Sequence, residues 1–224
     1  MTRSVHSDAK LTQAETLPVK PSDHANPNRN NKGGRKQDIL EALAQMLEKC
    51  PGERITTARL AREVGVSEAA LYRHFPSKAK MFEGLIEFVE DSIFSRINLI
   101  NSNDASTAEK CYLTLSLLLT FAEKNPGITR ILMGDPLTGE NDRLRKRVVQ
   151  FFDRVETQLK QFLREAPVRD GRESNIPVDQ AANLLLSIAT GKICQYVRND
   201  FSADPTTNWE SQWVLLEGAL FCHN

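Results

Sequence analysis

The chain of 224 residues lacks the short motifs that mark most enzymes and metal sites. It contains no Walker-type phosphate loop, no Gly-x-Gly-x-x-Gly and no His-x-x-x-His, and its four histidines are dispersed. No serine or cysteine stands in a local nucleophile motif. We therefore expect a protein that is not an enzyme and that has no catalytic residue, no metal ligand and no cofactor.

The chain also has few cysteines and no long apolar run. Cys50, Cys111, Cys194 and Cys222 form no Cys-x-x-Cys pair, which predicts free thiols in a reducing compartment. The most apolar stretch, residues 113–121, is interrupted by Thr and Ser and is too short to span a membrane. No secretory signal pattern opens the chain. We expect a cytoplasmic protein without a membrane partner.

The formal net charge is zero, so no overall field favours nucleic acid. The charges are nevertheless distributed unevenly along the chain. Residues 29–80 carry eleven Lys or Arg against six Asp or Glu, whereas residues 81–224 carry fifteen against twenty. A basic front part joined to an acidic remainder is typical of a protein that presents one end to phosphate and repels it elsewhere.

The N-terminal third of the chain contains the pattern of a helix-turn-helix. Thr56 is placed to cap a first helix with apolar residues at helical spacing, and Ser67 is placed to cap a second helix. Between them, Gly65 suits the turn because its backbone can take a positive φ. Leu71 and Phe75 are expected to face inward. The start of the second helix is then free to enter a DNA major groove.

The remaining periodicity predicts an all-α protein in three parts. We expect a disordered arm over residues 1–34, a helix-turn-helix domain over residues 35–80, and a helical dimerisation and partner-binding domain over residues 81–224. Outside the helix-turn-helix, the predicted helices span residues 36–49, 78–101, 105–124, 128–133, 141–165, 178–200 and 205–221.

Several of these helices have informative apolar faces. The helix over residues 78–101 has a regular core stripe, with Phe88, Phe94 and Leu99 outside it. The helix over residues 105–124 is apolar on nearly all sides, which predicts a central buried position. The faces of the last two helices either bury against an identical pair in a dimer or fill the core of one subunit. The residues expected in a dimer interface are Leu184, Leu185, Ile188, Trp209, Trp213, Leu216 and Leu220.

The second helix of the helix-turn-helix resembles the recognition helix of the TetR family of dimeric bacterial regulators. Tyr72, His74, Phe75 and Lys78 all stand in the positions of that family. The resemblance implies a TetR-like all-α fold, a homodimer and binding to palindromic double-stranded DNA. It implies phosphate contacts from Thr56, Tyr72, His74 and Lys78, base-edge contacts from Ser67, Glu68, Ala69 and Arg73, and a place for Thr57 in the same DNA-binding set.

Further segments resemble one group within the TetR family, the nucleoid occlusion factors. These segments are residues 54–61, 64–78, 85–93, 96–100, 123–132 and 197–201. In that group the DNA-bound dimer binds FtsZ, the tubulin-like division protein, and blocks septum assembly over the chromosome. The resemblance therefore implies a nucleoid-associated protein. It also implies an FtsZ-facing surface that includes Phe88, Arg96, Leu117, Thr120, Lys124 and Asn125.

The chain departs from this group at three positions. Thr120 and Ala122 stand where the group usually has Gly, and Lys124 stands where it usually has Arg. Lys keeps the positive charge of Arg but loses its bidentate geometry. For Leu117, simple packing in the core is an equal alternative to a contact with the partner.

The alternative function is that of a ligand-responsive TetR-type transcriptional repressor. In such a protein a small molecule in the C-terminal domain drives release from an operator. This function requires polar groups that converge within the apolar helices. The scattered candidates, which are equally consistent with hydrogen-bonded core residues, are Tyr112, Thr114, Ser116, Ser187, Thr190 and Tyr196.

Overall fold

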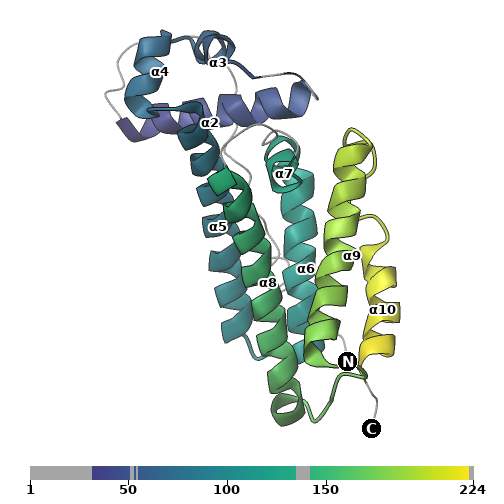
Figure 1. Ribbon diagram of the computed structural model, residues 1–224. Coiled ribbons are helices and arrows are strands. Elements are labelled where there is room, and N and C mark those ends of the chain that lie inside the picture. The colour runs from purple at the N-terminus through teal and green to yellow at the C-terminus, as the bar shows by residue number, and fades with distance from the viewer. Residues whose placement is uncertain (1–31, 51–52, 54, 135–141, 222–224) are drawn as a thin grey trace. The chain divides into compact units, whose positions relative to one another are not determined.

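The computed structural model describes residues 32–50, 53, 55–134 and 142–221. These residues form nine α-helices and no β-strand, which confirms the predicted all-α class (Figure 1). The helices are α2 (Lys32–Lys49), α3 (Thr57–Val64), α4 (Glu68–His74), α5 (Lys78–Ser102), α6 (Thr107–Lys124), α7 (Pro126–Leu132), α8 (Asp142–Arg169), α9 (Val178–Arg198) and α10 (Trp209–Leu220).

The largest differences from the predicted boundaries lie near the C-terminus. Helix α8 continues through Pro167 to Arg169, although the sequence predicts an end at residue 165. Helix α10 begins at Trp209 and not at residue 205, because Asn208 takes a left-handed conformation that interrupts the helix. At the other end, α2 begins at Lys32, inside the segment expected to be a disordered arm, and the rest of that arm lies outside the described residues.

The chain divides into two compact units that each combine separate segments. One unit, called here the head unit, contains the described residues up to Val89 together with Asn125–Val148. The other, called the body unit, contains Glu90–Lys124 together with the described residues from Val149 onward. Helices α5 and α8 each contribute to both units.

In the head unit, α2 packs against α3, α4 and α7. Its side chains Ile39, Leu43 and Leu47 are buried, as their helical spacing predicts. A buried polar contact also joins α2 to α7, because Arg130 Nη1 donates to the backbone oxygen of Leu47 over 2.9 Å. Carbonyl groups in the last turn of a helix have no partner within the helix. The guanidinium therefore satisfies an acceptor at the end of α2.

In the body unit, α6 is the central helix and is buried on almost every side. Helices α9 and α10 both pack against it (Figure 1). The indole of Trp209 donates to Ser116 Oγ over 2.8 Å, and its ring stacks on Tyr112 with a centroid distance of 6.3 Å. The two tryptophans of α10 are thus core residues of their own subunit. Within the described residues, the helices are all too short or too polar to cross a membrane.

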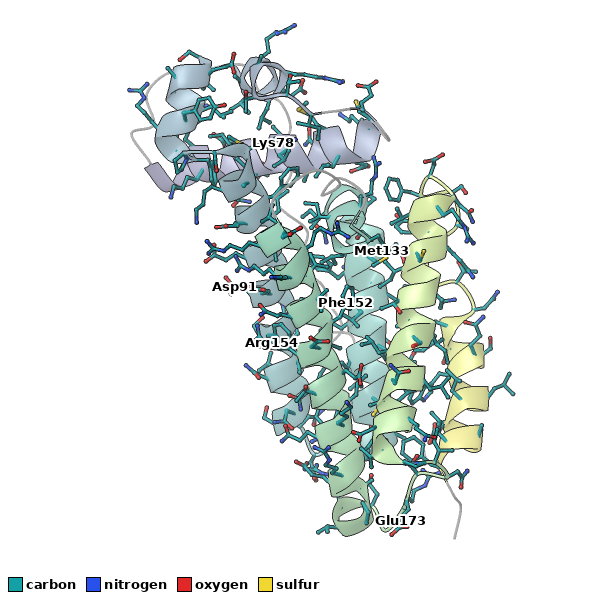
Figure 2. The ribbon with its side chains drawn as sticks, in the orientation of Figure 1. Lys78, Asp91, Met133, Phe152, Arg154 and Glu173 are labelled. Carbon is teal, nitrogen blue, oxygen red and sulfur yellow. The ribbon has the colours of Figure 1, made fainter. Side chains whose placement is uncertain are left out.

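Helix α5 packs against α8 through an aromatic cluster in the body unit. The rings of Phe94 and Phe151 meet edge to face at 5.6 Å, and Phe152 packs edge to face on Phe151 at 5.1 Å. The guanidinium carbon of Arg154 lies 3.7 Å from the centroid of the Phe94 ring, and Figure 2 labels Phe152 and Arg154 on α8. Phe94 lies outside the main stripe of α5 because it serves this second contact.

Candidate DNA interface and partner surface

The helix-turn-helix is built by local interactions that the sequence encodes directly. Thr56 accepts a hydrogen bond from the backbone N–H of Arg59, and Ser67 accepts one from that of Ala70. Each side chain therefore caps the helix that follows it. Gly65 ends α3 with a φ of 73°, a left-handed conformation that an L side chain rarely adopts. These predicted roles are all found in the structure.

The second helix of the motif, α4, buries one side and leaves the other accessible. Leu71 and Phe75 are buried against the head unit, as expected. Of the nine residues predicted to bind DNA, none is buried. Thr56, Ser67, Glu68, Ala69, Tyr72 and Arg73 are exposed, whereas Thr57, His74 and Lys78 are half-buried. The caps and the inward side chains thus leave the start of α4 open to a groove.

Three residues of the predicted DNA-binding set form a hydrogen-bonded chain that links α3 to α4. The Tyr72 hydroxyl donates to Thr57 Oγ1 over 3.3 Å, and Thr57 Oγ1 donates to the Glu68 carboxylate over 2.8 Å. These two hydrogen bonds fix one carboxylate oxygen of Glu68 at the first turn of α4. The predicted DNA-binding set contains these residues, but the hydrogen bonds between them are not predictable from the sequence, since Thr57 and Tyr72 are fifteen residues apart.

Basic side chains continue from α4 into the first turn of α5. Lys78 Nζ stands over the ring of Phe82 at 5.4 Å from its centroid, and Figure 2 labels Lys78 at the start of this helix. Lys80 Nζ lies 2.5 Å from the Glu83 carboxylate. This hydrogen bond holds the pKa of Glu83 below its usual range, and the charge of Arg143 acts in the same direction. The positive charge of Lys80 is therefore partly neutralised within the protein.

The residues predicted to face FtsZ are not all accessible. Phe88, Arg96 and Thr120 are half-buried, and Lys124 at the end of α6 is exposed. Phe88 and Arg96 are both residues of α5, eight positions apart in the sequence. Phe88 belongs to the head unit, whereas Arg96, Thr120 and Lys124 belong to the body unit.

The expectation that Leu117 and Asn125 touch a partner requires correction. Leu117 is 0% exposed and Asn125 is 6% exposed. Leu117 lies in the central helix α6, which packs on nearly all sides, so its side chain is a core residue. The backbone oxygen of Asn125 accepts hydrogen bonds from both the backbone N–H and the hydroxyl of Thr129, so this residue shapes the start of α7. In this conformation neither side chain can contact a partner directly.

The predicted dimer interface also requires correction. Leu185, Trp209, Trp213 and Leu220 are buried within their own subunit, and Ile188 and Leu216 are half-buried. The stripe that begins at Trp209 packs on α6 because the indole meets Ser116 and Tyr112 there. Leu185, Trp209, Trp213 and Leu220 therefore pack within their own subunit, whereas Leu184, Ile188 and Leu216 of the predicted set remain accessible to a second copy.

One face of the last two helices is apolar and exposed, and it includes Leu184 of the predicted interface. On α10, Val214 is 66% and Leu215 is 75% exposed, and on α9 Leu184 is 41% exposed. Exposed small residues extend this face along both helices: Ser187, Gly191 and Cys194 on α9, and Ser211, Gly218 and Ala219 on α10. Leu184 of this face belongs to the predicted interface, whereas Val214 and Leu215 do not, because the aromatic stripe of α10 gives the stronger periodic signal.

Comparison with known proteins places this geometry in a family. Residues 39–85 match the model of the bacterial regulatory proteins of the tetR family. The fold is similar to that of the fatty acid degradation regulator FadR from Bacillus halodurans, with a TM-score of 0.71 and 16% identity over 84% of this chain and 97% of that chain. The MbdR regulator from Azoarcus sp. CIB also has a TM-score of 0.71, with 17% identity over 83% of this chain and 98% of that chain. The chain is a helix-turn-helix protein of the TetR family.

The C-terminal part of the chain identifies a narrower family. Residues 106–220 match the SlmA-like model described as a tetracyclin repressor-like C-terminal domain. The nucleoid occlusion factors SlmA from Shewanella sp. (strain W3-18-1) and Shewanella amazonensis are each 58% identical over 83% of this chain and 94% of the relative. The nucleoid occlusion factor SlmA from Shewanella denitrificans is 57% identical over 83% of this chain and 94% of the relative. Within the TetR family, the chain belongs to the SlmA family of nucleoid occlusion factors.

Proposed function

We propose that this protein is a homodimer that binds palindromic DNA and, when DNA-bound, binds FtsZ to block septum assembly over the nucleoid. The observation that carries the proposal is the 58% identity to nucleoid occlusion factors over 94% of their length. Generic TetR regulators of the same fold share less than a quarter of their residues with this chain. The proposed function therefore rests on the nucleoid occlusion factors, and the solved structures support the fold alone.

The DNA-binding part of the proposal rests on the accessible side of α4. Ser67, Glu68, Ala69 and Arg73 are exposed and lie in and just before the short helix that would enter the major groove. Tyr72 within this helix and Lys78 at the start of α5 are suited to phosphate. A neutral protein binds DNA through a local basic surface, and the surplus of basic residues in this part of the sequence supplies one.

The dimer part rests on the exposed apolar face of α9 and α10. Valine and leucine side chains that are mostly exposed in one subunit lose apolar surface from water when two copies pair. Leu184, Val214 and Leu215 would form the apolar centre of a two-fold interface, and the small residues around them allow close approach of the helices. A dimer presents two copies of α4 to the two halves of a palindrome.

The FtsZ part rests on Phe88 and Arg96, with Thr120 and Lys124. An aromatic ring and an Arg are the residue types that most often dominate interface energy. Both are accessible in part, so a partner can reach them without unfolding α5. Because Leu117 and Asn125 are buried, their role in the proposed surface is to support the neighbouring turns.

The decisive experiment measures FtsZ binding in the presence of DNA. The specific duplex is first selected from a random pool by the parent protein. Co-sedimentation with FtsZ polymers is then measured for the parent and for the variants Phe88→Ala and Arg96→Asp. The control variant is Arg164→Asp, a matched charge reversal on the exposed side of α8. We expect Phe88→Ala and Arg96→Asp to lose FtsZ binding with DNA affinity unchanged, and Arg164→Asp to bind like the parent. A parent protein that neither binds FtsZ nor alters its polymers would contradict the proposal.

One observation bears on the alternative of a ligand-responsive repressor. Among the described residues, the hydroxyl of Thr114 is buried in α6 without a hydrogen-bond partner. Three of the other polar candidates already have hydrogen-bond partners within the protein. Ser116 accepts from Trp209, Thr190 donates to Leu186, and Tyr196 donates to Glu123. Thr114 is the only one of the six candidates with a buried hydroxyl that lacks a partner, and one such group by itself defines no polar ligand site.

A further inference from the structure

The loop between α9 and α10, residues 199–208, has unusual backbone geometry. Among the described residues, the only non-glycine residues with positive φ are Asp200 at 47°, Phe201 at 62° and Asn208 at 59°, and all three lie in this loop. Such conformations cost free energy for residues with a Cβ, and they persist only where the surroundings determine them. The loop includes residues 199–201 of the segment 197–201, one of the segments that resemble the nucleoid occlusion factors and that the proposed DNA and FtsZ contacts do not use.

Backbone hydrogen bonds hold the loop in this conformation. The N–H of Phe201 donates to the oxygen of Tyr196 over 2.9 Å, and the N–H of Ser202 donates to Asn199 over 3.1 Å. The rings of Tyr196 and Phe201 pack together at 5.1 Å. Lys192 Nζ donates to the backbone oxygen of Thr207 over 3.0 Å. The loop is therefore a fixed element of the body unit.

Residues of this loop and of the end of α9 form hydrogen bonds with the last turn of α6. The Thr206 hydroxyl donates to the Glu123 carboxylate over 2.5 Å. The Tyr196 hydroxyl, whose residue is buried, donates to the backbone oxygen of Glu123 over 3.3 Å. Carbonyl groups in the last turn of a helix lack partners within it, so the tyrosine caps α6 from outside. One glutamate is thus held by both its side chain and its backbone.

The same turn of α6 carries two residues of the proposed FtsZ surface. Thr120 lies four residues after Ser116 and three before Glu123, and both of these residues contact the α10 side of the body unit. Helical geometry therefore places Thr120 on the face toward that side. Lys124 follows Glu123 directly, about 100° further around the helix. A shift of Glu123 would move both residues.

We propose that Thr206 and Tyr196 are positioning residues: they hold the end of α6 so that Thr120 and Lys124 can meet FtsZ. The inference rests on the proposed FtsZ-binding function. It assigns the strained loop a role in partner binding in addition to its packing within the body unit. It also links the partner surface to α9 and α10, the helices proposed to form the dimer.

The test removes single hydroxyls with little change in side-chain shape. Thr206→Val and Tyr196→Phe each delete one hydrogen bond to Glu123. Thr206→Ser restores the hydroxyl, and Thr207→Val makes the same substitution at the next, exposed position, whose contact with Lys192 uses only backbone. Each variant is assayed for FtsZ polymer binding with specific DNA, for DNA affinity, and for amide hydrogen exchange at residues 120–125.

We expect Thr206→Val to weaken FtsZ binding on the order of tenfold, because a hydrogen bond to a carboxylate is lost. Tyr196→Phe should act in the same direction. Exchange at the end of α6 should accelerate in both variants while DNA affinity is unchanged. Thr206→Ser and Thr207→Val should resemble the parent.

The outcomes separate this inference from the proposed function. If the parent binds FtsZ and both hydroxyl deletions bind it equally well, the positioning role is wrong and the proposed function stands. If the deletions accelerate exchange at α6 without weakening FtsZ binding, the loop stabilises the helix only, and the inference is also wrong. A parent that does not bind FtsZ at all overturns the proposed function, and the inference falls with it.

Discussion

Gly127 of α7 lies directly against the backbone of Ala44 in α2, so closely that a Cβ on Gly127 would stand 2.0 Å from the Ala44 oxygen. That distance is far inside van der Waals contact, and the obstructing atom belongs to a helix backbone that cannot rotate away. Together with the contact from Arg130 to Leu47, it joins α7 tightly to α2 within the head unit. The absence of a side chain at residue 127 is therefore a condition for this packing.

The first prediction follows from that contact. Gly127→Ala should destabilise the protein by about 1–3 kcal/mol, the usual cost of overpacking, because α7 must separate from α2. Gly84→Ala is the matched control in the same unit, since its Cβ would meet only the side chains of Leu40 and Phe75 at 3.2 Å or more. Urea unfolding measures both. Equal stability of the two variants would show that α7 can move at no cost.

The second prediction concerns DNA and separates two neighbouring lysines. Lys78→Ala should weaken binding to all DNA sequences and lower the salt dependence of binding by about one unit, because one phosphate contact is lost. Lys80→Ala should change the salt dependence less, because Lys80 already forms an ion pair with Glu83 at 2.5 Å. Fluorescence anisotropy over a series of salt concentrations measures both slopes. Identical slopes for the parent and Lys78→Ala would remove Lys78 from the DNA contacts.

The features predicted correctly from sequence are those that depend on neighbouring residues. Thr56 and Ser67 cap their helices through hydrogen bonds that span three residues, and Gly65 takes a positive φ because the turn requires it. The core stripe of α5 follows from helical spacing alone, and all its members are buried: Phe82, Leu85, Ile86, Val89, Ile93, Ile97 and Ile100. Such features need no knowledge of what packs on the helix.

The features that sequence could not supply depend on which of several apolar faces meets which neighbour. Helix α10 has one face with Trp209 and Trp213 and another with Val214 and Leu215. Periodicity identifies both faces but cannot say which faces inward. Helix α6 is apolar all round, so no pattern distinguishes Leu117 as a core residue from a partner contact. The hydrogen bond from Thr206 to Glu123 joins residues 83 positions apart, so no pattern of neighbouring residues predicts it.

The third prediction concerns pH and Cys111 in α6. Burial raises the pKa of this thiol to about 12, from 9.0 in the unfolded chain. Protonated Cys111 therefore stabilises the fold fully below pH 9.0, and this contribution is lost as the pH rises toward 12. Between pH 8 and pH 10 the parent should lose about 1 kcal/mol more stability than Cys111→Ala, which lacks the group that titrates. Urea unfolding at both pH values measures the difference, and parallel losses would show that Cys111 ionises in the folded state.

The last prediction distinguishes the two apolar faces of α10. Leu215→Arg places a charge on the exposed face, where one subunit alone tolerates it but a dimer would bury it without a partner. We expect this variant to sediment as a folded monomer with weakened binding to a palindrome. Trp213→Ala changes the inward face instead, and the lost burial in the core should cost about 3–5 kcal/mol of subunit stability. Analytical ultracentrifugation and thermal unfolding separate the two effects. A Leu215→Arg protein that remains a dimer at the same concentration as the parent would place the interface elsewhere, because a dimer cannot bury two unpaired arginines at its centre without a large loss of affinity.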